Sequence, residues 1–425
     1  MQPTSPTDRF ASRAALADRL QAVRAHTLGL AEPLSAEDQQ AQSMPDASPT
    51  KWHLAHSSWF FEAVVLQRFA PSYRPFDERF ARLFNSYYES LGSRHPRPQR
   101  GLLTRPSLVQ VLAYRRHIDE ALQALVRSAD EDTWRQAAPL VELGLHHEQQ
   151  HQELILTDVL HLLSLNPLSP AYAPPPATAV SRIEPSEPGW WNGGGGDVEI
   201  GHEPQRGFAF DNEGPRHPVK LAPFALARQL VTNGDYLAFI EEGGYRRPEF
   251  WLSDGWALVQ AQGWQAPPYW RDGAREFGLH GEQPRNPQAP VAHLSFYEAA
   301  AYAAWAGARL PTEFEWEAAL QAWGATPPSS PSPLVPGPRH SAADPQCFGA
   351  VWQWTRSSYD PYPGFKPWDG TVAEYNGKFM VGQLVLRGSS CATPPGHARL
   401  TYRNFFPPGA RWQFSGLRLA RDLEP

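Results

Sequence analysis

A proline-rich segment divides this sequence into two parts of different texture. Residues 165–188 contain seven prolines, a density that is typical of a semi-rigid linker between domains. After this segment, Gly, Pro, Trp and Tyr are frequent, and runs with strand character are short. We therefore expect an α+β protein with a helical domain over 1–170, a linker over 171–190 and a second domain over 191–425.

Apolar residues in the first part recur at steps of three and four, as in amphipathic helices. This pattern covers residues 8–30, 50–70, 106–128 and 132–165. Four helices of this length favour a four-helix bundle. Thr50 is the expected N-cap of the second helix, and Pro106 is expected in the first turn of the third.

Other patterns predict features outside the bundle helices. Ser295 and Thr312 are each followed by Glu three residues later, which is typical of a capping box and predicts two helices in the second part. Residues 324–345 are of low complexity and are expected to form a surface insertion. The connection over 71–105 is long, and long connections without regular structure are often functional.

Composition argues against several classes of protein. The net charge of −6 does not favour the basic face that a nucleic-acid partner requires. Two cysteines, Cys347 and Cys391, are too few for a disulfide scaffold or a cysteine-rich metal protein. The sequence has no run of 18 apolar residues, and its first residues lack the apolar core of a signal peptide. We expect a cytoplasmic protein without a membrane span.

The clearest chemical signal is a pair of histidines in the fourth predicted helix. His147 and His151 are four residues apart, so on a helix they share a face and suit one metal ion. Glu153 lies about 200° around the helix from His151 and does not readily join the same coordination sphere. A third ligand is expected on another helix. His56 shares a helix face with Trp59, which predicts an inward-facing imidazole.

Three neutral imidazoles without a thiolate or carboxylate ligand leave coordination positions open. This ligand set suits a non-haem Fe(II) centre that binds O2 and substrates directly. Three histidines and a water molecule also describe many zinc sites. Ligand type alone leaves both metals open.

Three motifs in the first part resemble a DinB-like four-helix domain. They are KWHLAHSSWFFE (51–62), LFNSYYESLG (83–92) and HHEQQHQE (146–153).

Four motifs in the second part resemble the fold of formylglycine-generating enzymes, which is similar to C-type lectins. They are WLSDGW (251–256), RLPTEFEWEAA (309–319), VWQW (351–354) and the segment 387–422, which begins with RGSSCATPPGHARLTYRNFF. The two resemblances in one chain, with the motifs in the expected order, identify a similarity to the ergothioneine-type sulfoxide synthases (EgtB).

That resemblance implies an oxidoreductase that uses Fe(II) and O2 to join a thiol to the imidazole C2 of hercynine, which is Nα-trimethylhistidine. The product is a sulfoxide in ergothioneine biosynthesis. The resemblance also implies that His56, His147 and His151 are the iron ligands. Formylglycine-generating enzymes bind copper through two neighbouring cysteines, but here Cys391 lies 44 residues after Cys347. We expect both cysteines to be small buried apolar side chains.

Tyrosines are the expected proton donors, because the reaction must direct O2 away from simple thiol oxidation. Tyr87 and Tyr88 lie in the long connection, where polar aromatic residues are candidates for a site. The resemblance implies that a subgroup of these synthases uses such a pair at the iron. Other members place the tyrosine in the second domain, where Tyr375 is the nearest candidate.

The resemblance implies that Gln150 and Asn404 help to bind hercynine. Aromatic faces can hold its quaternary ammonium group, although core packing is the commoner role of phenylalanine. The candidate rings for this contact are Tyr402, Phe405, Phe406 and Trp412.

The thiol donor is expected to carry a carboxylate, which Arg97 or Arg100 could bind. Members that use γ-glutamylcysteine resemble one another in an Asn-Trp-Asp segment, which here is Asn404-Phe405-Phe406. Phenylalanine cannot pair with an ammonium group as a carboxylate does, so we expect another donor, with cysteine first.

Three alternatives remain open. Selenoneine synthases share the two-domain plan and use a selenosugar, and the segment Arg387-Gly-Ser-Ser departs from the usual Gly-Gly-Ser. A zinc-dependent thiol transferase of DinB type would use the first domain alone. A lectin-like binding protein would use only the second.

Overall fold

The computed structural model describes residues 12–175, 189–330, 334–337 and 345–424. Contacts divide these residues into two units, with the first boundary between Leu165 and Asn166. The bundle unit comprises the residues up to Leu165 together with Glu203–Phe210 and Lys366–Lys378. The sheet unit comprises the remaining residues.

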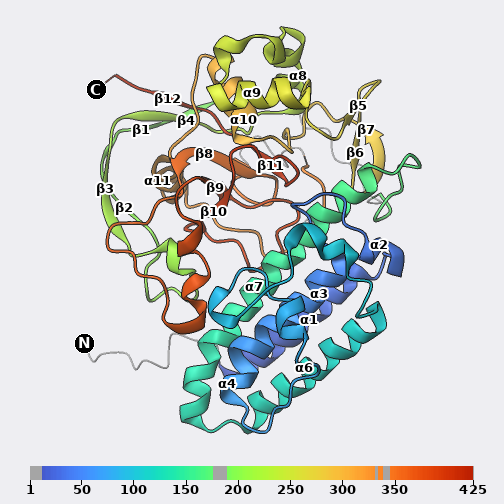
Figure 1. Ribbon diagram of the computed structural model, residues 1–425. Helices are drawn as coiled ribbons and strands as arrows, with labels where there is room; N and C mark the ends of the chain where they lie inside the picture. The colour runs from blue at the N-terminus through green and yellow to red at the C-terminus, as the bar shows by residue number, and fades with distance from the viewer. Residues whose placement is uncertain (1–11, 176–188, 331–333, 338–344, 425) are drawn as a thin grey trace. The chain divides into compact units, whose positions relative to one another are not determined.

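Four helices form the bundle and run side by side (Figure 1). They are α1 (Arg13–Ala31), α3 (Thr50–Phe61), α6 (Leu108–Ser128) and α7 (Glu131–Ser164). A π-helical turn, η2 (Glu62–Leu66), extends α3 into α4 (Gln67–Phe69), and two further helices are short, α2 (Ala36–Gln40) and α5 (Phe80–Leu83).

Helix α3 is central to the bundle unit, because it packs against both α6 and α7. All 12 of its residues are buried. A helix that is buried on every side cannot leave a polar side chain in water, so each of its histidines needs a partner inside the protein.

Two helix starts differ from the sequence-based expectation. The N-cap of α3 is Pro49, and Thr50 is already the first helical residue. Pro106 lies outside α6, because Ser107 is the N-cap and accepts a hydrogen bond from the N–H of Gln110 in a capping box. The serine hydroxyl satisfies the first turn, so the helix starts after the proline.

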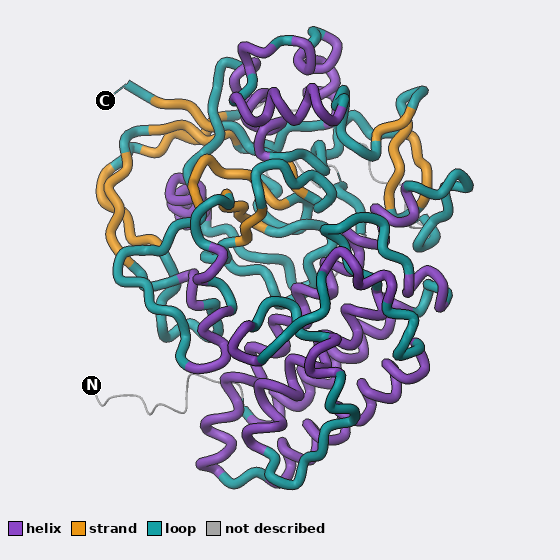
Figure 2. The backbone as a smooth tube through the Cα atoms, in the orientation of Figure 1, coloured by secondary structure: helices purple, strands orange, loops and turns teal. Residues whose placement is uncertain are grey.

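The sheet unit contains short strands separated by long loops (Figure 2). A four-stranded sheet has the order β10 (Asn404–Phe406), β9 (Leu384–Gly388), β8 (Trp352–Ser358) and β11 (Ser415–Gly416), and only β11 pairs in parallel. A three-stranded sheet has the order β1 (Trp190–Gly193), β4 (Phe224–Ala227) and β12 (Ala420–Asp422). The other strands form the pair β2 (Gly196–Ile200) and β3 (His217–Leu221) and the meander β5 (Trp270–Arg271), β6 (Arg275–Gly278) and β7 (Gly281–Pro284).

The helices of the sheet unit are α8 (Asn233–Glu241), α9 (Ser253–Gln262), α10 (Phe296–Trp305) and α11 (Glu313–Trp323). The capping boxes predicted at Ser295 and Thr312 are both confirmed, and they start α10 and α11. The expected α+β class, with a helical part before a mixed part, is also confirmed.

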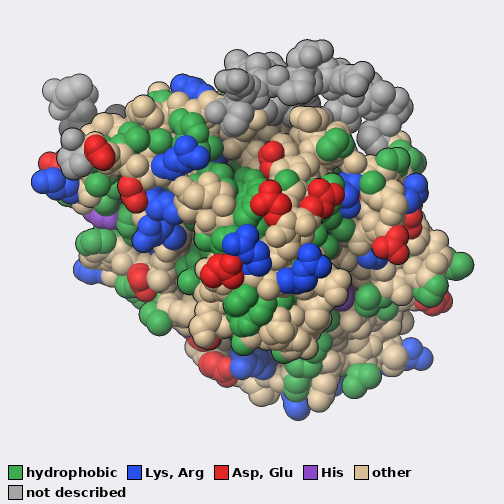
Figure 3. Space-filling view, turned by 90° about the horizontal axis from the view of Figure 1, so that it is seen from above, with side chains coloured by type: hydrophobic (Ala, Val, Ile, Leu, Met, Phe, Trp, Pro, Cys, Tyr) green, Lys and Arg blue, Asp and Glu red, His purple; other side chains and the backbone are tan. Residues whose placement is uncertain are grey.

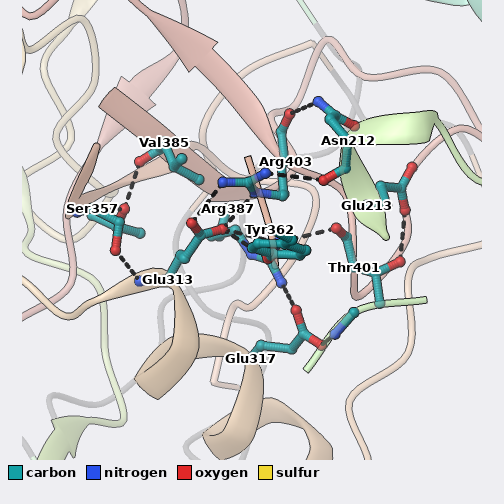
Figure 4. Close-up of polar contacts among 12 residues, drawn as sticks. Asn212, Glu213, Glu313, Glu317, Ser357, Tyr362, Val385, Arg387, Thr401 and Arg403 are labelled. Atoms are coloured by element: carbon teal, nitrogen blue, oxygen red, sulfur yellow. Dashed lines mark hydrogen bonds and ion pairs between the residues drawn. The ribbon is translucent and has the colours of Figure 1, made fainter. Parts of the chain in front are cut away.

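Helix α11 carries two buried carboxylates that are paired with arginines from the C-terminal part of the chain (Figure 4). Glu313 accepts two hydrogen bonds from Arg403, at 2.8 and 2.9 Å. Glu317, one turn later, pairs with Arg387. Because buried charges are tolerated only when they are paired, this network fixes α11 against β9, which carries Arg387, and against the loop before β10, which carries Arg403.

Parts of three predicted features lie outside the described residues. These parts are residues 8–11 of the first predicted helix, 176–188 of the predicted linker, and 331–333 and 338–344 of the predicted insertion. Within the described chain, no helix is both long enough and apolar enough to cross a membrane. On the face shown in Figure 3, basic and acidic side chains are interspersed.

Candidate metal centre

Helices α3 and α7 bring His56, His147 and His151 together in the bundle unit. One ring nitrogen of each lies within 4.8 Å of the others, and Nε2 of His56 is 3.2 Å from Nε2 of His147. All three side chains are buried. The two histidines of α7 reach the cluster because residues four apart share a helix face. The structure therefore brings together the three ligands predicted from the sequence.

Aromatic packing and a backbone carbonyl orient the first two rings. Nδ1 of His56 donates to the carbonyl oxygen of Phe84 at 2.6 Å, which directs Nε2 toward the cluster. Trp52 stacks on His56 with ring centroids 4.5 Å apart. Phe60 stacks on His147 at 4.3 Å, and among the described residues nothing hydrogen-bonds Nδ1 of His147.

The third ring is held by two further side chains. Nδ1 of His151 lies 2.8 Å from Nδ1 of His53. Nε2 of His53 lies 2.9 Å from a carboxylate oxygen of Asp158.

Burial keeps the three imidazoles neutral. It lowers the pKa of His56 and of His151, each with a further contribution from His147. It also lowers the pKa of His147 to about 3. The neutral imidazole is the form that binds a metal. Three converging lone pairs with no carboxylate among them fit a transition-metal ion better than Mg²⁺ or Ca²⁺, which prefer oxygen.

The nearest carboxylate in the sequence faces away from this cluster. Glu148 follows His147 directly but accepts hydrogen bonds from Arg24 and Arg115, at 2.9 and 2.8 Å. Its position, about 100° around α7 from His147, puts it on a different face. The ion pairs thus engage this carboxylate on a face of α7 other than that of His147.

A tyrosine pair packs against the α3 side chains whose rings stack on His56 and His147. Tyr88 is fully buried, and its ring packs against Trp59 with centroids 5.6 Å apart. The hydroxyls of Tyr87 and Tyr88 are 3.4 Å apart. Burial, followed by the effect of Tyr87, raises the pKa of Tyr88, so its hydroxyl keeps its proton.

Tyr375 also belongs to the bundle unit, although it lies far along the chain. Its ring centroid is 5.8 Å from that of His147. Its hydroxyl donates to Oε1 of Gln150 at 2.6 Å. Thus Gln150 and Tyr375 meet beside the metal cluster.

The segment Lys366–Lys378, which carries Tyr375, is hydrogen-bonded to the turn that follows Tyr87 and Tyr88. Glu374 accepts hydrogen bonds from the N–H groups of Glu89 and Ser90, at 3.1 and 2.9 Å, and pairs with Lys378. Burial would raise the pKa of Glu374, but Lys378 and the two N–H groups outweigh this and lower it to about 2. Because the folded-state pKa is depressed, this contact is intact above pH about 4.5 and weakens as the pH falls toward 2.

Glu203–Phe210 is the other segment of the bundle unit that comes from the later part of the chain, and it packs against the rest of that unit through aromatic side chains. Phe208 stacks on His146 with centroids 4.0 Å apart, and Phe210 stacks on Tyr375 at 5.4 Å. Sequence reasoning missed these residues and Glu374. Helix periodicity gives no sign of a segment that returns to the bundle from elsewhere in the chain.

The two predicted arginines differ in environment. Arg100, in the 3₁₀ turn η4 (Arg97–Leu102), is 4% exposed and lies over the ring of Trp52 at 3.4 Å. It donates to the hydroxyl of Ser48 at 2.9 Å. No ion pair among the described residues involves it, and its Nε atom has no hydrogen-bond partner. Arg97 is exposed and donates to the carbonyl oxygen of Asp46.

The predicted residues of the second domain lie on β10 in the sheet unit. Asn404 Oδ1 accepts from the N–H of Phe405 at 2.9 Å. Phe405 stacks on Tyr359 with ring centroids 4.0 Å apart, and Phe406 packs edge-on against Trp412 with centroids 6.4 Å apart.

Two further predictions concern buried residues of the sheet unit. Tyr402 is buried and packs against Trp352. Cys347 and Cys391 are both buried, as expected.

Both parts of the chain match known protein families. The DinB superfamily matches residues 19–155. The sulfatase-modifying factor enzyme 1-like domain matches residues 186–327 and 345–423.

Curated relatives match nearly the full length. Hercynine oxygenase of Mycolicibacterium smegmatis is 36% identical over 97% of this chain and 100% of its own length. Hercynine oxygenase of Mycobacterium tuberculosis is 33% identical over 96% of this chain and 99% of its own. Ergothioneine biosynthesis protein 1 of Schizosaccharomyces pombe is 25% identical over 51% of this chain and 28% of its own.

The substitution Glu374→Gln tests how the segment Lys366–Lys378 is held. It keeps the shape of the side chain but removes the charge that the two N–H groups and Lys378 contact. A charge-assisted hydrogen bond contributes about 1.5 kcal/mol, so amide hydrogen exchange in this segment should accelerate roughly tenfold. Glu89→Gln is the matched control, because the Glu89 side chain lies on the same turn and is exposed. Equal exchange rates in the two variants would contradict this role of Glu374.

Proposed function

This chain belongs to the hercynine oxygenase family of EgtB-type sulfoxide synthases, a family of oxidoreductases, and on that premise we propose that it uses Fe(II) and O2 to join a thiol to imidazole C2 of hercynine. The product would be a sulfoxide on the route to ergothioneine. The observation that carries the proposal is the buried, neutral cluster of His56, His147 and His151.

The three imidazoles would hold the iron. Bound Fe(II) would supply O2 activation and one-electron chemistry at coordination positions that the protein leaves open. The protein contributes a site without carboxylate ligands, since Glu148 is paired with Arg24 and Arg115. It also excludes bulk water, because the rings of Trp52 and Phe60 cover two of the imidazoles.

Tyrosine hydroxyls would supply the proton that directs the reaction toward C–S bond formation. We propose Tyr87 and Tyr88 for this role, with Tyr375 as the alternative. The raised pKa of Tyr88 supports a phenol that holds its proton until it is needed. The short distance from Tyr375 to His147 and its hydrogen bond to Gln150 support the alternative.

Hercynine would be bound by Gln150 and Asn404, whose amide groups suit directed hydrogen bonds to the imidazole and the carboxylate. Phe405 and Phe406 are proposed to contact the trimethylammonium group. The stacking of Phe405 on Tyr359 leaves Phe406 as the better candidate of the two.

The thiol donor would place its carboxylate at Arg100. A buried guanidinium without a carboxylate partner is costly unless a ligand supplies the counter-charge, and Arg100 meets that description. We propose cysteine as the donor, because the segment Asn404-Phe405-Phe406 offers no carboxylate to a γ-glutamyl ammonium group.

A selenosugar remains the alternative donor, although the contacts of the two serines do not favour it. The hydroxyl of Ser389 accepts from the N–H of Gly349, and that of Ser390 accepts from the N–H of Ala392. Both hydroxyls therefore have roles inside the fold.

A donor screen tests the proposed function. Protein loaded with Fe(II) is incubated with hercynine, O2 and, in turn, cysteine, γ-glutamylcysteine and a selenosugar. We expect hercynine-dependent O2 uptake and a sulfoxide adduct with cysteine, detected by mass spectrometry. Turnover with the selenosugar alone would favour selenoneine synthesis. Activity that needs zinc and persists without O2 would favour a thiol transferase, and no hercynine-dependent O2 uptake with any donor would contradict the proposal.

The substitution Arg100→Met tests the carboxylate site. It keeps the length and the apolar contacts of the side chain but removes the charge. We expect KM for the thiol donor to rise roughly tenfold or more, because a hydrogen bond to a charged group contributes about 1.5–3 kcal/mol. KM for hercynine should stay unchanged. Arg97→Met is the control, and equal effects of the two substitutions on the thiol KM would rule out a specific role for Arg100.

A further inference from the structure

Two buried residues beside the histidine cluster have no part in the function proposed above. They are His53 of α3 and Asp158 of α7, which are 2% and 6% exposed. We propose that they form a positioning pair that orients His151 and fixes its tautomer, so that Nε2 of His151 presents its lone pair to the metal. This inference rests on the proposed function only in assuming that the cluster binds a metal.

Helix geometry places both residues on the correct faces. His53 precedes His56 by three residues and therefore shares its face of α3. Asp158 follows His151 by seven residues, about two turns along the same face of α7. His53 thus bridges the two helices and contacts His151 at one ring nitrogen and Asp158 at the other.

The hydrogen-bond chemistry allows one consistent arrangement with a neutral His53. The Asp158 carboxylate can only accept, so Nε2 of His53 donates to it. Nδ1 of His53 then carries a lone pair and must accept. The contact of 2.8 Å between the two Nδ1 atoms therefore makes His151 the donor. With its proton on Nδ1, His151 keeps the lone pair on Nε2 for a metal.

Asp158, at the end of this series of hydrogen bonds, is itself held in place. The N–H of Ser48 donates to the same oxygen of Asp158 at 2.8 Å. The Ser48 hydroxyl accepts from Arg100, so a guanidinium lies one residue away from the buried carboxylate. These contacts fix the position of the Asp158 carboxylate as a hydrogen-bond acceptor inside the protein.

His56 shows the same arrangement achieved by other means. The Phe84 carbonyl oxygen accepts from Nδ1 of His56 and leaves Nε2 for the cluster. For His151, the residues that fix the ring are side chains, and they can be replaced without altering the backbone. Replacing the His53 and Asp158 side chains therefore tests their role directly.

Binding of Co(II), which absorbs visible light according to its ligands, tests the inference without turnover. Affinity is measured by competition with a chelator for the unsubstituted protein, His53→Leu and His53→Asn. Leucine fills the space but cannot accept a hydrogen bond, whereas the asparagine oxygen can accept from Nδ1 of His151. We expect His53→Leu to weaken Co(II) binding by about 10- to 100-fold and to alter the absorption bands. His53→Asn should bind nearly as tightly as the unsubstituted protein.

Asp158→Leu should weaken binding as much as His53→Leu does, and the double variant should lose little more, because the two residues act in series. His161→Asn is the control. His161 lies on α7 but hydrogen-bonds Ser43 and takes no part in the series of hydrogen bonds from His151 to Asp158. Circular dichroism and thermal unfolding confirm that each variant is folded.

Two results would overturn the inference. One is Co(II) binding by His53→Leu that equals that of the unsubstituted protein. The other is the reverse order, in which leucine is tolerated and asparagine is not, because that order indicates a packing role alone. A double His147→Ala, His151→Ala variant with unchanged Co(II) binding would instead contradict the metal site of the proposed function. The two failures are therefore distinguishable.

Discussion

The desolvation of three neutral imidazoles between α3 and α7 is the constraint on which the rest of the bundle unit depends. Buried polar groups must be satisfied, and here Nδ1 of His56 is satisfied by a carbonyl oxygen and that of His151 by His53. The inner nitrogens converge on one another. Helix α7 carries different groups on two faces, because Glu148 forms buried ion pairs with Arg24 and Arg115 while His147 and His151 converge with His56.

Residues from distant parts of the chain complete the surroundings of this cluster. The segment that carries Tyr375 is held by the carboxylate of Glu374 and by the ring of Phe210. The helices would thus supply the metal ligands, while loops and inserted segments supply hydroxyl groups. In this arrangement rigid helices would fix the ligands, and less regular segments would determine which proton donor and which substrate reach them.

The sequence predicts the parts of this site that follow from helix periodicity. His147 and His151 are four residues apart on α7, so helix geometry places them on one face. His56 meets them because α3 packs against α7 in the bundle. The role inferred for His53 could not be predicted, because a helix buried on all sides gives both of its histidines an inward position. Glu374 was not predictable either, since its partners lie almost 300 residues earlier in the chain and are backbone groups.

The proposed activity requires that His56, His147 and His151 together bind one iron ion. Anaerobic loading with Fe(II), removal of excess metal and metal analysis test it most directly, applied to the protein and to a folded His147→Ala, His151→Ala variant. We predict about one iron per chain in the unsubstituted protein and essentially none in the variant, because one remaining imidazole does not make a site. Equal iron content in the two proteins would contradict it.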